Sequence, residues 1–180
     1  MNTSTNQALG PVPALKSDCA NCAAMCCIAL ARDKSEAFGF DKPAGLPCPN
    51  LVGHKCSIHK SLEWEGFKGC ADYECAGAGQ RITQELFAGQ SWKDKPRLAR
   101  PMIDAFRQMR LVHEFIELLL AAKGLPLPIS VEAQRERLLA QLLPEAWTTD
   151  SLQDFETGIL PGAIRAFLAS LREHVRRNAP

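Results

Sequence analysis

All eight cysteines of this 180-residue chain lie between residues 19 and 75. That segment contains only seven Ile, Leu or Val residues, whereas residues 97–143, a shorter stretch, contain sixteen. A segment so poor in large aliphatic side chains cannot close a good core alone, and small folds of that kind are held by disulfides or metal ions. The cysteines are therefore the feature that most constrains how the first half of the chain folds.

The cysteines occur in three blocks whose spacing suits metal ligation. A C-x2-C step places two thiolates on one side of a tight turn, where both reach a metal at about 2.3 Å. We expect Cys26 to share a helix face with Cys22, and Cys27 to point about 100° away from Cys26. Eight thiolates then divide into two four-coordinate sites. The candidate metal ligands are Cys19, Cys22, Cys26, Cys27, Cys48, Cys56, Cys70 and Cys75.

The chemistry of the donors leaves the metal open. All-thiolate ligation suits zinc and iron–sulfur centres alike, so the expected cofactor is two zinc ions or an iron–sulfur cluster. Structural zinc binds peptides with an apparent free energy of about 10–16 kcal/mol. Whole domains are stable by only about 5–15 kcal/mol. We therefore expect the metal to decide whether residues 19–75 fold at all.

These residues carry a resemblance to a known family. They resemble the YkgJ-type zinc- or iron-chelating (CxxCxxxCC) domain. The likeness lies in the block from Cys19 to Cys27, the Cys48–Leu51 step, the Cys56–Ile58 step and the pair Cys70 and Cys75. Residues 41–45, 47–51 and 77–80 resemble the cysteine region that precedes some bacterial pentapeptide-repeat proteins, although no such repeats follow here. The resemblance implies metal chelation by the cysteines, and it extends no further than about Gly79.

Two other roles for the cysteines compete with metal binding. An even number of cysteines would favour disulfides in a secreted chain, but the N-terminal residues do not resemble a secretory signal, so we expect a cytoplasmic protein with reduced thiols. A catalytic thiol would need a base such as His54 or His59, and seven other cysteines would then lack a role. We find no acid–base pair to defend as catalytic, and the chain reads as a non-enzyme.

Charge gives little support for a nucleic-acid or membrane partner. The net charge is +1, and no apolar run approaches the roughly 20 residues of a membrane helix. Residues 93–110 have a local excess of positive charge, which would suit a nucleic-acid-binding regulator. We prefer the interpretation that these charges lie on an ordinary solvated helix face. The expected partner is a metal ion. A protein partner is left open, a membrane is not expected, and nucleic acid is not favoured.

The second half of the chain predicts helices. Apolar residues from Met102 to Leu119 recur at steps of three and four, and Gly124 with Pro126 is a stop signal. Ser130 is the expected cap of a second helix, Asp150 with Gln153 a capping box for a third, and Pro161 the start of a fourth.

The predicted fold class is mainly α. We divide the chain into a flexible tail (1–15), a loop-rich metal-stapled cysteine module (16–80) and a C-terminal helical bundle (81–180) on which the module packs. No strand pattern is convincing. The leading function is metal handling or metal-stabilised interaction, and an iron–sulfur role in electron transfer or redox sensing is the alternative.

Overall fold

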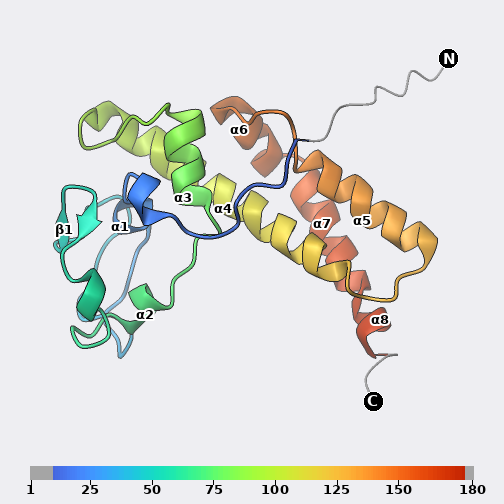
Figure 1. Cartoon of the computed structure of the whole chain (residues 1–180), viewed down its shortest axis with the longest axis horizontal. Coiled ribbons are helices and arrows are strands. Elements are labelled where there is room, and N and C mark those ends of the chain that lie inside the picture. Colours follow the sequence, from blue (N-terminus) through green and yellow to red (C-terminus); the bar gives the residue numbers. More distant parts are fainter. Residues whose placement is uncertain (1–9, 177–180) are drawn as a thin grey trace. The chain divides into compact units, whose positions relative to one another are not determined.

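The computed structural model describes residues 10–176, so most of the predicted N-terminal tail lies outside the described residues. The described chain forms two compact units, one of residues 14–111 and one that joins residues 10–13 to residues 112–176. The units divide inside the long helix α4 (Ala99–Ala122), whereas the change in cysteine content led us to place a boundary at residue 80. Figure 1 shows the elements of each unit.

The first unit consists of short elements joined by loops. Its helices are η1 (Cys19–Asn21), α1 (Met25–Ala29), η2 (His59–Ser61), α2 (Lys68–Ala71), α3 (Ala78–Arg81), the π-helix η3 (Ile82–Leu86) and η4 (Pro96–Leu98), followed by the first half of α4. Strands β1 (Leu51–Val52) and β2 (Lys55–Cys56) form a two-residue antiparallel hairpin. The sequence shows no alternation long enough to predict this hairpin, because each strand has only two residues.

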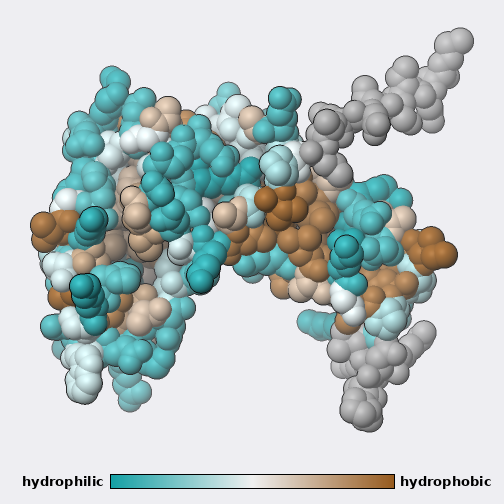
Figure 2. Space-filling model, viewed as in Figure 1, coloured by the Kyte–Doolittle hydropathy of each residue, from teal (hydrophilic) through white to brown (hydrophobic). Residues whose placement is uncertain are grey.

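The second unit contains the rest of α4 together with α5 (Ile129–Gln141), α6 (Thr149–Thr157), α7 (Leu160–Ser170) and α8 (Arg172–Arg176). The apolar stripe predicted for α4 is confirmed, since Met102, Phe106, Met109, Ile116 and Leu119 are all almost completely buried. The space-filling view shows hydrophobic surface gathered over this helical unit, while the drawn face of the first unit is largely hydrophilic (Figure 2).

Two predicted caps are wrong. Helix α5 begins after Pro128, so Ser130 lies inside its first turn. The capping box of α6 consists of Thr148 and Ser151, each of which bonds the other's backbone N–H, in place of Asp150 and Gln153. Both errors are shifts of two residues. At α6 the sequence offers four adjacent residues able to cap a helix, residues 148–151, whereas the N-cap of α5 is Pro128, whose side chain makes no cap hydrogen bond.

The prediction of a mainly α fold is confirmed, because the described residues outside loops are almost all helical. Among them, no helix is both long enough and apolar enough to cross a membrane.

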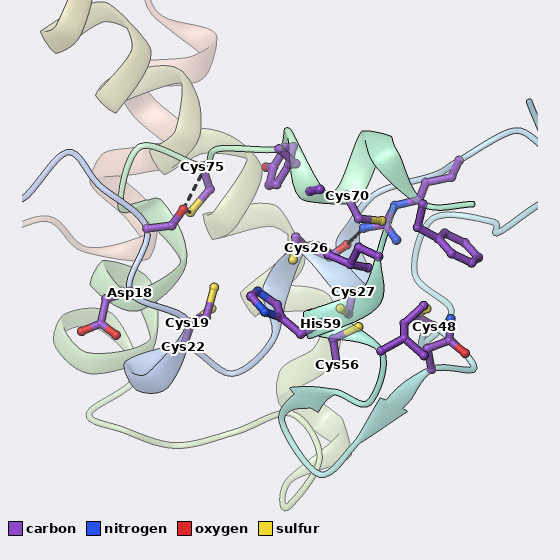
Figure 3. A pocket seen from close by; sticks show the side chains of 18 of the residues that line it. Asp18, Cys19, Cys22, Cys26, Cys27, Cys48, Cys56, His59, Cys70 and Cys75 are labelled. Carbon is purple, nitrogen blue, oxygen red and sulfur yellow. Dashed lines mark hydrogen bonds between the residues drawn. The ribbon is translucent and has the colours of Figure 1, made fainter. Parts of the chain in front are cut away.

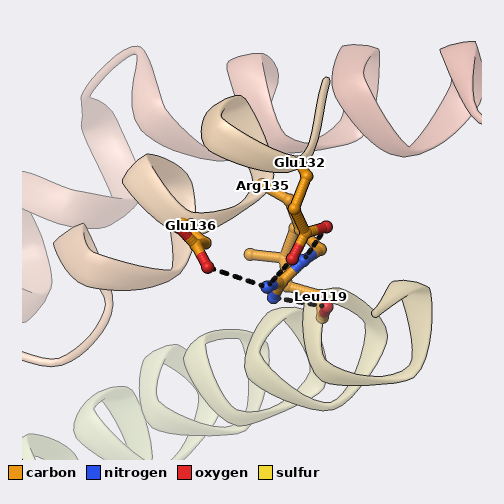
Figure 4. Close-up of polar contacts among 4 residues, drawn as sticks. All are labelled: Leu119, Glu132, Arg135 and Glu136. Carbon is orange, nitrogen blue, oxygen red and sulfur yellow. Dashed lines mark hydrogen bonds and ion pairs between the residues drawn. The ribbon is translucent and has the colours of Figure 1, made fainter. Parts of the chain in front are cut away.

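A buried arginine connects α5 to the C-terminal turn of α4. The guanidinium of Arg135, only 3% exposed, binds Glu132 and donates to the backbone carbonyl of Leu119 at 3.2 Å (Figure 4). Leu119 is among the last four residues of α4, whose carbonyls have no partner within the helix. Because α4 has no basic residue in its last turn, Arg135 supplies the positive charge that the helix dipole favours there.

We predict that Arg135→Met lowers the free energy of unfolding by about 1–3 kcal/mol, because the buried Leu119 carbonyl loses its donor. Arg137→Met is the matched control, since Arg137 is exposed on the same helix and should change stability by less than about 0.5 kcal/mol. Urea denaturation followed by circular dichroism measures both. Equal effects of the two substitutions would contradict the role given to Arg135.

Candidate metal centre

All eight cysteines line one cavity of about 590 Å³ in the first unit (Figure 3). The structure thus brings together every residue that the sequence analysis named as a ligand. All eight are free thiols; Cys48 and Cys75 are buried and Cys19 is exposed. The other residues that line the cavity are Ser17, Asp18, Arg32, Asn50, Ile58, His59, Leu62, Phe67, Ala71, Tyr73, Gln80 and Phe106.

The helix expected to carry the first cysteine block is interrupted at Ala24. This residue has φ 55° and ψ 43°, the left-handed conformation, so η1 ends before it and α1 begins after it. Cys22 and Cys26 therefore do not share one helix face, and the prediction that they do is wrong. Cys26 and Cys27 do lie on one helix, where neighbouring side chains diverge by about 100°.

Cys19 and Cys22 are held by hydrogen bonds to α3 and η3. The Gln80 side chain accepts from the backbone N–H of Asp18 at 3.1 Å and donates to the carbonyl of Lys16 at 2.8 Å. The Gln84 amide donates to the carbonyl of Asn21, and the Thr83 hydroxyl accepts from the N–H of Ala23. These polar side chains replace the aliphatic packing that the segment lacks.

Cys75 is attached to the same segment through Ser17. The Ser17 hydroxyl lies 3.0 Å from the Cys75 sulfur and accepts from the Cys75 backbone N–H at 3.2 Å. The Glu74 carboxylate accepts from the backbone N–H of Ser17 at 2.9 Å. Cys75 is therefore fixed beside the residues that precede Cys19.

Cys27, Cys48 and Cys56 are joined by backbone hydrogen bonds. The N–H of Cys48 donates to the carbonyl of Cys27 at 3.0 Å, and the N–H of Leu51 donates to the carbonyl of Cys48 at 3.0 Å. Leu51 in turn pairs with Cys56 across the β1–β2 hairpin. The hairpin thus places Cys56 near the Cys27–Cys48 contact.

Two buried cations lie near these thiols. The Nζ of Lys42, a residue only 3% exposed, donates to the carbonyls of Ile28, Pro43 and Leu46. Arg32 is 8% exposed, lines the cavity, and exchanges two backbone hydrogen bonds with Lys42. Within residues 10–176 neither side chain forms an ion pair with a carboxylate. Burying a cation without an anionic partner is costly, so thiolates are the natural counter-charges.

The thiols differ in acidity because their surroundings differ. A hydrogen bond from Cys27 lowers the pKa of Cys26 to about 7, helped by the Arg32 guanidinium and opposed by burial. The same hydrogen bond, followed by burial, raises the pKa of Cys27. Burial raises the pKa of Cys22 to about 11 and also raises the pKa values of Cys19, Cys56 and Cys70. Without a metal, most of these thiols are protonated at neutral pH.

Tyr73 and Trp64 differ in their relation to the cavity. Tyr73 lines the cavity, and its buried hydroxyl has no hydrogen-bond partner among the described residues. The Arg110 guanidinium lies over the Tyr73 ring, 5.6 Å from its centroid. Trp64, in contrast, is 95% exposed and does not line the cavity.

The donors line the cavity wall without converging on one point. Within residues 10–176, no three His, Cys, Asp or Glu side chains form a group that could hold a metal ion as they stand. The structure therefore gathers the predicted ligands in one place but does not itself display a coordination geometry.

Several basic side chains of the segment 93–110 form contacts within the chain. Lys93 donates to the carbonyl of Gly53 at 2.8 Å, Lys95 donates to Gln90 at 2.9 Å, and Arg100 pairs with Asp104 at 2.7 Å. Of these contacts, the Arg100–Asp104 pair offsets a positive charge, whereas the hydrogen bonds of Lys93 and Lys95 go to uncharged groups and leave their charges in place. The nucleic-acid alternative stays a prediction.

Substitution of Gly79 tests whether the position of the Cys22 thiol depends on close packing against α3. A Cβ on Gly79 would lie 2.6 Å from the Cys22 sulfur, so we predict that Gly79→Ala displaces this thiol. Zinc binding should weaken by about tenfold or more, equivalent to ~1.4 kcal/mol, in a chelator competition assay. Gly162→Ala is the control: a Cβ there meets nothing within 4 Å, so zinc binding should not change. Unchanged zinc affinity in Gly79→Ala would refute the steric argument.

The chain is 46% identical over 103 residues to a Bacillus subtilis (strain 168) protein named Uncharacterized protein YybG. The alignment covers 57% of this chain and 37% of that protein, so the chain spans well under half of the relative's length. No family model matches the chain, and no solved structure matches it. The resemblance to the YkgJ-type domain therefore stays a prediction.

Proposed function

We propose that this chain is a metal-binding protein that holds zinc or iron through its eight clustered cysteines and acts in metal handling or as a metal-stabilised interaction module. The observation that carries the proposal is the position of the thiols: residues up to 56 positions apart in sequence, from Cys19 to Cys75, line a single cavity. Cysteines that served only to fill the core would not be expected to line one cavity together.

The cavity also has the size and polarity of a ligand site. Protein interiors are close-packed, with few voids larger than a water molecule, whereas ligand sites occupy about 300–1,000 Å³. The cavity of about 590 Å³ falls in the second range. The buried Tyr73 hydroxyl lacks an acceptor in the described chain, and a metal-bound sulfur near it would provide one.

The buried cations fit a centre with negative charge. Four thiolates around one divalent ion carry a net charge of −2, so a tetrathiolate site is itself an anion. Arg32 and Lys42, which have no carboxylate partner among the described residues, would balance such a charge inside the protein. The donor set and its surroundings therefore fit the metal that the resemblance implies.

An iron–sulfur centre is the second candidate, and one observation favours it. A single tetrahedral zinc needs little more room than its four sulfurs enclose, while an inorganic cluster brings iron and sulfide atoms of its own. A cavity of about 590 Å³ shared by all eight cysteines has room for such a cluster. Iron–sulfur binding would supply electron transfer or redox sensing in place of a purely structural role.

Metal content is the direct test. The full-length protein, purified without oxygen, should contain about two zinc ions per chain and be colourless, or contain iron and sulfide and be brown. Elemental analysis and a visible spectrum distinguish these results. A folded protein that contains neither metal, and takes up neither when supplied, would overturn the proposal.

We also predict that zinc binding strengthens as the pH rises from about 6 to about 8. Cys22, with its pKa raised to about 11, and Cys27, whose pKa is also raised, are protonated in this range and must lose their protons to bind. The slope of log affinity against pH then equals the number of protons released. Competition titrations at several pH values, corrected for the chelator's own protonation, measure it, and a flat profile would contradict thiol ligation.

A further inference from the structure

We propose that the cavity holds two adjacent metal centres with separate ligand sets, one of Cys19, Cys22, Cys26 and Cys75 and the other of Cys27, Cys48, Cys56 and Cys70. This inference rests on the proposed function and deepens it by assigning each cysteine. It follows from how the chain fixes the thiols: one set of contacts holds Cys19, Cys22 and Cys75, another holds Cys27, Cys48, Cys56 and Cys70, and Cys26 lies between them.

The first group is attached to α3, to η3 and to the residues just before α3. Gln80 holds residues 16–18 through two hydrogen bonds, and Gln84 holds Asn21 through another. Ser17 contacts both the sulfur and the backbone N–H of Cys75. Figure 3 shows Cys19, Cys22 and Cys75 together on one side of the cavity, next to Asp18.

The second group is fastened to the hairpin and the loop before it. The backbone bond from Cys48 to Cys27 and the Leu51–Cys56 register connect three of its members. Cys70 lies on α2, which is attached to the loop after α1 through the hydrogen bond from Gly69 N–H to the Ala37 carbonyl at 3.0 Å. In Figure 3 these four cysteines lie on the opposite side from Cys19 and Cys75.

The vicinal cysteines divide between the two groups. Cys27 belongs to the second because its carbonyl accepts from Cys48, and in Figure 3 its side chain lies on the side of Cys56. Cys26 lies between the groups in Figure 3 and completes the first set of four. Neighbouring residues on α1 diverge by about 100°, so one helix turn supplies a ligand to each centre.

The two centres have opposite electrostatic surroundings. Asp18 and Glu74 adjoin the first group, and the Glu74 carboxylate accepts from Ser17 beside Cys75. Lys42 is tied to the segments that carry the second group, through the carbonyls of Ile28 and Leu46. Arg32 donates to the carbonyl of Cys26 on α1, the helix that supplies one ligand to each group. A charged metal–thiolate unit is better stabilised near the cations than near the carboxylates. The second centre should therefore bind the first equivalent of metal.

Cadmium-113 NMR of the full-length wild-type protein tests the assignment without any substitution. Two equivalents of Cd²⁺ should give two resonances in the tetrathiolate region, and the two should fill in sequence as cadmium is added. A single tetrathiolate resonance, or one centre that needs more than four thiolates, would overturn the two-centre assignment while leaving metal binding intact. Absence of any thiolate-bound cadmium would overturn the proposed function as well.

Substitutions then identify which cysteine belongs to which centre. Cys75→Ser should shift or abolish the later-filling cadmium resonance only, and Cys56→Ser the earlier one only, with bound metal reduced to about one equivalent in each case. If Cys75→Ser and Cys56→Ser disturb the same resonance, the assignment is wrong.

Ser17→Ala provides a milder variant that retains every thiol. It removes the contact to the Cys75 sulfur and should weaken the later-filling site by several-fold while leaving the other site unchanged. Ser57→Ala is the matched control, because Ser57 is exposed and its hydroxyl bonds only the Asn50 carbonyl at 2.9 Å. Equal weakening of both sites by Ser17→Ala would refute the separation of the two ligand sets.

Discussion

Polar contacts between distant segments hold the cysteine region together, and the position of every thiol depends on them. The Gln80 amide, the Ser17 hydroxyl and the Cys48–Cys27 backbone bond each connect residues far apart in sequence. Each such bond contributes only about 0.5–1.5 kcal/mol net. Ordering one residue costs about as much in backbone entropy alone. Contacts of this kind position the thiols but contribute little net stability. The metal of the proposed function would add a cross-link between the same segments.

The buried charges fit the same requirement. Lys42 has its ammonium group in a ring of carbonyl oxygens, which solvate it without neutralising it. Burial of this ammonium group lowers the pKa of Lys42. A negatively charged centre nearby would turn this destabilising burial into a favourable interaction. The charge arrangement and the thiol arrangement therefore support the same proposal by independent physical arguments.

The sequence predicted the helical half better than the cysteine region. The stripe from Met102 to Leu119 was readable because a buried helix face imposes a period on apolar residues, and those residues are buried. The common location of the eight cysteines could be anticipated from composition and spacing. The hydrogen bonds of Gln80 and Ser17 could not, since they connect residues about 60 positions apart and leave no periodic trace. The burial of Arg32 and Lys42 could not be predicted, because a sequence alone does not distinguish a buried cation from an exposed one.

The left-handed Ala24 has a consequence for the register of the first cysteine block. Because Ala24 has a left-handed backbone conformation, α1 begins only at Met25. The residue at which a helix begins determines the direction in which each following side chain points. A one-residue insertion or deletion between Ala24 and Cys26 would rotate the vicinal pair by about 100° about the helix axis. The spacing of this block therefore specifies the rotation of the candidate ligands about the helix axis, which a count of cysteines does not convey.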